Sequence, residues 1–253
     1  RGEILTGIGL NRGHASASAI SLVTSCQSAL SFPMPRMPAS AFEKTAVATG
    51  VAIAVVAWTA LATNRTTPRA VQFSDKELSY FIADGDPQTG YVQSDRQLAQ
   101  WAFEQWARSA SGSFELRQSP EKDALVRLYW TPLNDSTFGE MRRLTVNGHP
   151  GAAVFVRADM EALGLEMSLH AKRDPLWRDT IVYLTCLHEL GHALGLEHTN
   201  DFRDIMYFFG YGGDIVEYFS RYRRLLKSRS DIPSASGLSE ADITRLRSLH
   251  PSR

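Results

Sequence analysis

The sequence is poor in cysteine and carries no excess of charge. Its two cysteines, Cys26 and Cys186, lie far apart in different kinds of segment, which excludes a small fold held by a disulfide framework. Lys and Arg together number 27, and Asp and Glu also number 27, so the formal net charge is zero. A neutral chain has no general attraction to nucleic acid, and we expect no nucleic-acid partner.

The composition is otherwise typical of a globular protein. With 253 residues, 43% hydrophobic and 21% charged, the chain has room for one large domain and additional segments. We expect the protein to be a monomer. Residues 1–43 do not resemble a domain: they begin Arg1-Gly2-Glu3, without an initiator Met, and are rich in Ser and Ala. We expect either a flexible extension or sequence upstream of the true start, for which Met34 and Met37 are candidates.

An uncharged run at 45–62 lies within a segment, 44–63, that we interpret as a signal peptide or a single membrane anchor. Ala60-Leu61-Ala62 fits the small-x-small cleavage pattern, whereas the run is longer than the usual ~7–15 apolar residues of a signal core. Both alternatives place the rest of the chain outside the cytoplasm, secreted or membrane-anchored. Residues 64–72 are polar and contain Pro68, which predicts a linker before a domain at 73–253.

Three histidines around residue 190 have the spacing of a metal site. His188 and His192 are four residues apart, which on a helix places both imidazoles on one face, where they can bind one tetrahedral Zn²⁺ at about 2.0–2.1 Å. Gly195 can end the helix in a left-handed conformation and bring His198 back to the metal. Three neutral nitrogens and a water form a catalytic site with an open position, and Glu189 beside the first ligand can take a proton from that water.

The whole pattern, His188-Glu189-Leu190-Gly191-His192-Ala193-Leu194-Gly195-Leu196-Glu197-His198 followed by Asp204-Ile205-Met206-Tyr207, resembles the matrixin branch of the metzincins. The resemblance covers roughly 72–252. It implies an α+β zincin fold: a twisted, mostly parallel five-stranded sheet with an antiparallel edge strand, a central zinc-binding helix, a Met-turn and a C-terminal helix.

The resemblance implies a zinc metalloendopeptidase that acts on a peptide or protein substrate. One alternative is a catalytically silent zinc-binding or peptide-binding module on the same fold; the presence of Glu189 argues against it. A second alternative is a small-peptide or self-processing protease with a closed cleft.

The expected elements follow from apolar periodicity together with this resemblance. We expect strands at 78–82, 113–116, 124–130 (a central strand), 144–146 and 152–156. We expect helices at 97–106, capped by Ser94 or Asp95; at the zinc motif, starting at Asp179; and at 237–249, with a capping box from Ser239 to Asp242. Cys186 is expected to face the core, away from the metal.

The resemblance also predicts the surroundings of the metal. Met206 would form the floor beneath the ligands, Asp242 would hydrogen-bond to the Met-turn, and Tyr207-Phe208-Phe209 would wall the cleft. Ala153-Val154-Phe155 would be the antiparallel edge strand over the cleft, where a substrate could add as a strand.

Residues 210–237 are longer than the family pattern and predict an inserted amphipathic helix. Apolar residues recur there at helical spacing, and basic residues crowd the same segment. Either the basic face is simply solvated, or the helix selects substrates or binds an anionic surface.

Further metal sites and a latency device are not recognisable. His149, Asp159, His170 and Asp174 lie where matrixins carry structural zinc and calcium, but their spacing is not the family's, so no motif supports a structural Zn²⁺ or Ca²⁺. No cysteine lies between the 45–62 run and the catalytic region. A propeptide cysteine that occupies the zinc is therefore not available from that position.

Overall fold

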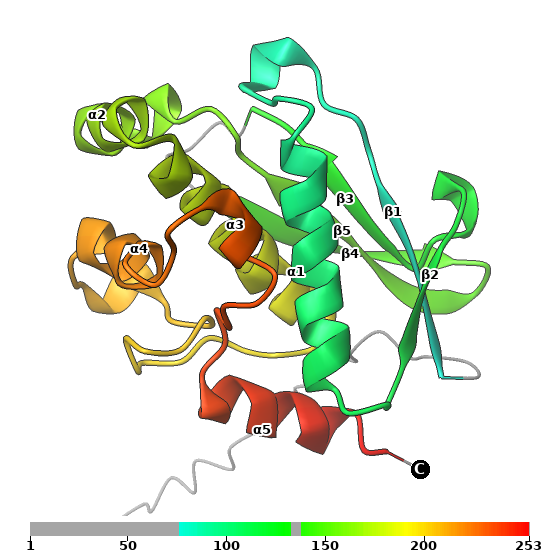
Figure 1. The fold of residues 1–253 in the computed structure, drawn as a ribbon. Helices are drawn as coiled ribbons and strands as arrows, with labels where there is room; N and C mark the ends of the chain where they lie inside the picture. Colours follow the sequence, from blue (N-terminus) through cyan, green and yellow to red (C-terminus); the bar gives the residue numbers. More distant parts are fainter. Residues whose placement is uncertain (1–75, 133–137, 253) are drawn as a thin grey trace, which may run out of the picture. The chain divides into compact units, whose positions relative to one another are not determined.

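A five-stranded sheet forms the framework of the domain. The computed structural model describes residues 76–132 and 138–252. Neighbouring strands follow the order β2-β1-β3-β5-β4; β1 is parallel to β2 and β3, β3 is parallel to β5, and β4 runs antiparallel to β5 at one edge (Figure 1). The predicted fold class is confirmed, with β3 as the central strand. The strands are β1 Glu77–Ile82, β2 Glu115–Gln118, β3 Val126–Trp130, β4 Gly139–Val146 and β5 His149–Val156.

The antiparallel edge strand is β4, and the prediction that Ala153-Val154-Phe155 forms it was wrong. These three residues lie in β5, which pairs with β3 on one side and with β4 on the other. The first half of β4 escaped detection because Glu140, Arg142 and Arg143 interrupt its apolar pattern. Asn147 and Gly148 join the two strands with φ of 50° and 82°, as a tight hairpin turn requires.

The helices cover one face of this sheet. α1 contacts β1 and β2, α3 contacts β4 and β5, and the two helices also contact each other. Figure 1 shows α1 and α3 side by side, with α5 across their lower ends and α4 on the far side of α3 from α1. The α-helices are α1 Asp95–Ser109, α2 Leu165–Arg173, α3 Pro175–Ala193, α4 Ile215–Arg223 and α5 Glu240–Leu249; single 3₁₀ turns occur at Pro87–Thr89, Glu121–Asp123, Glu161–Leu163, Phe209–Tyr211 and Arg229–Asp231.

The central helix α3 begins at Pro175, earlier than the predicted start at Asp179. The carboxylate of Asp174 accepts hydrogen bonds from the first free N–H groups of the helix, and Pro175 occupies a position where no N–H is needed. Asp179 instead lies in the second turn, where it pairs with Arg229. The helix is apolar nearly all round and buried, and Cys186 is fully buried as expected.

The predicted helix within 210–237 is present as α4, and its arginines make contacts within the domain. Arg223 pairs with Asp174 at 2.7 Å, Arg224 with Glu217 at 2.6 Å, and the Arg221 guanidinium lies 5.0 Å from the ring centre of Tyr218. These arginines therefore bind the start of α3 or other residues of α4 itself. α2, by contrast, was not predicted.

The segments predicted at 1–43, 44–63 and 64–72 lie outside the described residues, so the extension, the signal peptide or anchor and the linker stay predictions. Within 76–132 and 138–252, no helix is both long and apolar enough to span a bilayer.

Candidate metal centre and cleft

The end of α3 places two imidazoles one turn apart. His188 and His192 project from the last two turns, and the helix ends at Ala193. Gly195 has φ of 93°, a conformation that favours glycine, and it turns the chain toward His198.

The segment after His198 folds back beneath the helix. The N–H of Thr199 donates to the Met206 carbonyl at 2.8 Å, and the N–H of Phe208 donates to the Thr199 carbonyl at 3.0 Å. Met206 is fully buried against Gly191, where any added Cβ would overlap its sulfur. The predicted floor under the histidines is therefore present.

Three ring nitrogens converge at this point. The Nε2 atoms of His188 and His192 lie 3.3 and 3.0 Å from the Nε2 of His198, and within the described residues this is the one group of three or more His, Cys, Asp or Glu side chains placed to hold a metal. The opposite nitrogens are already engaged: Nδ1 of His188 donates to the Ile205 carbonyl at 2.6 Å, and Nδ1 of His192 to the Leu196 carbonyl at 2.8 Å. A carbonyl only accepts, so each Nδ1 carries the proton and each Nε2 presents a lone pair.

The surroundings keep all three imidazoles neutral. Burial, together with the neighbouring His192, lowers the pKa of His188 to about 3. Burial also lowers the pKa of His192, and burial with the nearby His192 ring lowers that of His198. Neutral imidazole is the form that binds a metal ion.

Glu189 lies beside the triad with its side chain turned toward the sheet. It is 7% exposed, and a Cβ added at Gly139 would lie 2.6 Å from its Cγ and 2.9 Å from its Oε1. The carboxyl thus contacts the start of the edge strand β4. Burial and, to a smaller extent, the charge of Glu140 raise the pKa of Glu189 to about 8; a divalent cation on the histidines would oppose this shift.

A cleft of about 490 Å³ opens beside the histidines. Of the predicted cleft residues, Tyr207, Phe208 and Phe209 line it, and the Phe208 ring stacks on His198 with centroids 4.8 Å apart. Ala153, Val154 and Phe155 do not line it, because β4 lies between β5 and this edge of the sheet.

Sequence reasoning missed most of the lining. The start of β4, the middle of α3 and the segment around α4 supply it, through Phe138, Gly139, Glu140, Met141, Leu184, Thr185, Ile215, Tyr218 and Phe219. The helical spacing of Ile215 and Phe219 was visible in the sequence, but the face they present to the cleft was not.

The residues considered for a second metal do not gather. His170 lies against the Trp177 ring at 5.1 Å, Asp174 caps α3, and His149 begins β5. The expected contact beneath the Met-turn is present: the Ile205 N–H donates to Asp242 at 2.8 Å, and Ser239 and Asp242 form the predicted capping box.

A histidine triad at the end of a buried helix, a Met-turn beneath it and an antiparallel edge strand beside it characterise a metalloprotease-type domain. The sequence profile of the matrixin family matches residues 72–214, more than half of the chain, and the chain belongs to this family of metalloproteases.

Similar proteins include two collagenases and an elastase. Interstitial collagenase of Sus scrofa is 26% identical over 154 residues, 59% of this chain and 31% of the collagenase. Neutrophil collagenase of Homo sapiens is 25% identical over 145 residues, 56% of this chain and 29% of the relative. Macrophage metalloelastase of Oryctolagus cuniculus is 42% identical over 48 residues, 17% of this chain and 10% of the elastase. The chain spans less than a third of the length of these relatives.

Proposed function

We propose that this chain is a zinc-dependent endopeptidase in which His188, His192 and His198 bind one Zn²⁺ and Glu189 is the general base. The observation that carries the proposal is the convergence of three Nε2 atoms beside a buried carboxyl group.

The donor set fits zinc. Nitrogen ligands at about 2.0–2.1 Å in tetrahedral geometry lie about 3.3–3.4 Å apart, close to the Nε2 separations of 3.3 and 3.0 Å. Three protein ligands leave a fourth position open, and the carbonyls of Ile205 and Leu196 hold two of the rings in the required tautomer. When bound, zinc polarises the scissile carbonyl and acidifies a water molecule.

The chain's own groups hold the substrate and move the proton. β4 pairs with β5 along one side. Within 76–132 and 138–252 no strand pairs with its other side, which can add a substrate peptide as an antiparallel strand. Because Glu189 lies against Gly139 at the start of β4, its carboxyl group is next to such a peptide. Glu189 takes a proton from the attacking water and then delivers it to the leaving amine.

The cleft favours a large apolar side chain. Its walls away from the histidines are mainly aromatic, with the Phe138 and Phe219 rings 5.3 Å apart and the Phe209 and Tyr218 rings 4.9 Å apart. Among the described residues, no Lys or Arg lines it, so an acidic side chain would be desolvated without a counter-charge. We expect cleavage next to bulky apolar residues.

The competing interpretations are less well supported. A silent binding module has no need of Glu189, and the exposed His198 and Phe208 at the mouth of the cleft do not favour a closed site. A monomeric protease acting outside the cytoplasm, secreted or anchored through 45–62, remains a proposal that rests on the sequence.

Cleavage of a quenched-fluorescence peptide library by the full chain tests the proposal. We expect cuts next to large apolar residues, loss of cleavage with a chelator and recovery on adding zinc. A folded, zinc-loaded chain that cuts no peptide in the library would favour the binding-module alternative.

A further inference from the structure

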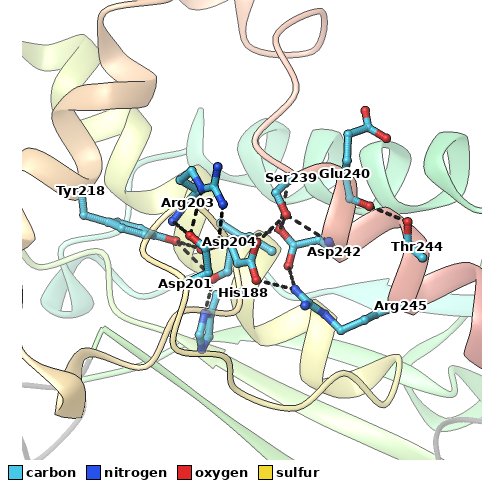
Figure 2. Close-up of polar contacts among 11 residues, drawn as sticks. His188, Asp201, Arg203, Asp204, Tyr218, Ser239, Glu240, Asp242, Thr244 and Arg245 are labelled. Atoms are coloured by element: carbon cyan, nitrogen blue, oxygen red, sulfur yellow. Dashed lines mark hydrogen bonds and ion pairs between the residues drawn. The ribbon is translucent and has the colours of Figure 1, made fainter.

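Two buried carboxylates lie side by side beneath the Met-turn. Asp204, from the segment just before Met206, is 2% exposed, and Asp242, from the first turn of α5, is 0% exposed. The hydroxyl of Ser239 lies 2.6 Å from Asp204 Oδ1 and 2.9 Å from Asp242 Oδ2 (Figure 2). A hydroxyl has one proton to donate, so Ser239 cannot fully satisfy both carboxylates.

Arg245 bridges this pair. Its Nη2 donates to Asp204 Oδ2 at 2.7 Å and to Asp242 Oδ1 at 2.8 Å, as Figure 2 shows. Two like charges held together in a buried position repel each other, and a cation between them removes most of that repulsion. Without the guanidinium, the two carboxylates would repel each other and move apart.

The cluster formed by Asp204, Asp242 and Arg245 is connected through Ile205 to His188, a candidate metal ligand. The Ile205 N–H donates to Asp242 Oδ2 at 2.8 Å, and the Ile205 carbonyl accepts from Nδ1 of His188 at 2.6 Å. On the opposite side, the Tyr218 hydroxyl lies 3.2 Å from the same carbonyl. The main chain at Ile205 is therefore held on both sides, and it in turn fixes the ring of His188.

We propose that Arg245 is a positioning residue for the metal centre: by holding Asp204 and Asp242 together, it fixes the Ile205 main chain and thereby the orientation of His188. The inference rests on the proposed zinc site. Partners that orient a metal-binding imidazole are commonly worth 10–100-fold in metal affinity, which sets the expected effect.

The test compares two arginines on the same helix. Arg245→Met removes the bridge, whereas Arg247→Met makes the same change two residues away, where Nε donates to the Ser109 carbonyl at the end of α1 at 2.9 Å. Zn²⁺ affinity of each full-length variant is measured by competition with a chromophoric chelator, and ligand geometry by the absorption spectrum of the Co²⁺-substituted chain. We expect Arg245→Met to bind zinc at least about tenfold more weakly than the parent, with an altered Co²⁺ spectrum, and Arg247→Met to match the parent.

Two further variants test the cause. A single nitrogen of Arg245 makes both contacts, so the ammonium of Arg245→Lys should recover most of the affinity. Adding Asp204→Asn to Arg245→Met removes one of the two charges and should also recover affinity; failure to do so contradicts the charge argument.

Equal zinc affinity and identical Co²⁺ spectra for Arg245→Met and Arg247→Met would overturn the inference. If Arg245→Met does not fold, Arg245→Gln, which is neutral but keeps a donor, takes its place under the same two outcomes. A parent chain that binds no zinc would instead refute the proposed function, so the two failures are distinguishable.

Discussion

Gly139 offers a sharp test of how Glu189 is placed. In Gly139→Ala the new methyl carbon would lie 2.6 Å from Cγ and 2.9 Å from Oε1 of Glu189. Carbon atoms in contact normally lie about 3.5–4.0 Å apart, so the carboxyl group or the start of β4 must move by about 1 Å. A misplacement of that size at a reacting group costs about 10²-fold in rate, or about 2.7 kcal/mol of transition-state stabilisation.

The assay is kcat/KM on the best library peptide, with zinc content and thermal stability measured on the same samples. We expect Gly139→Ala to keep one zinc per chain while losing about 10²-fold in kcat/KM. Gly148→Ala is the matched control: it lies in the turn of the same β4–β5 hairpin, its Cβ would meet nothing within 4 Å, and its φ of 82° predicts a loss of stability without a loss of rate. An unchanged kcat/KM in Gly139→Ala would refute the placement of Glu189 against β4.

Three further predictions concern stability and pH. Gly191→Ala should destabilise the fold by about 1–3 kcal/mol in chemical denaturation, because its Cβ would overlap the Met206 sulfur and lie 3.1 Å from the Trp106 ring. Arg178→Met should lower the free energy of unfolding by about 3–5 kcal/mol, because it leaves the fully buried Asp95 without its counter-charge. In the parent chain, two nitrogens of Arg178 bind Asp95 at 2.7 and 2.8 Å. Burial lowers the pKa of His250, so below the ordinary histidine value of about 6.5 the unfolded chain binds a proton that the folded chain does not, and the free energy of unfolding should fall as pH drops from about 7 to 5.

Two of these predictions have a control variant. Arg142→Met removes an exposed ion pair and should leave the free energy of unfolding almost unchanged; a similar loss in both arginine variants would contradict the assignment. His250→Gln should reduce the acid dependence of unfolding, and an unchanged slope between pH 7 and 5 would refute the role of His250. For Gly191, a melting curve indistinguishable from the parent's would show that Met206 is not packed as described.

The sequence predicted the parts whose signal is local. The spacing of His188, His192 and His198, with Gly195 at the turn, depends on helical geometry. Alternation indicated β1, and the apolar-rich run at 124–130 indicated β3. Asp242 was expected beneath the Met-turn through family resemblance, and its hydrogen bond to Ile205 is present.

Other features depend on contacts that the sequence does not display. Charged residues interrupt the apolar pattern in the first half of β4, so this part of the edge strand was not predicted. The edge position was assigned to residues of β5 instead. Asp174 was passed over as the cap of α3, although Pro175 directly after it is a helix-start signal that Asp179 lacks. The pairing of Arg245 with Asp204 joins residues 41 positions apart, and only the tertiary fold brings them together.

A single substitution at Glu189 separates metal binding from catalysis. Glu189→Gln keeps the size of the side chain and removes its ability to accept a proton, while His188, His192 and His198 are unchanged. Zinc content and peptide cleavage are measured on the same preparation of this variant. The account predicts one zinc per chain and a loss of cleavage of about 10²–10⁴-fold. Cleavage at the parental rate with zinc bound would contradict it.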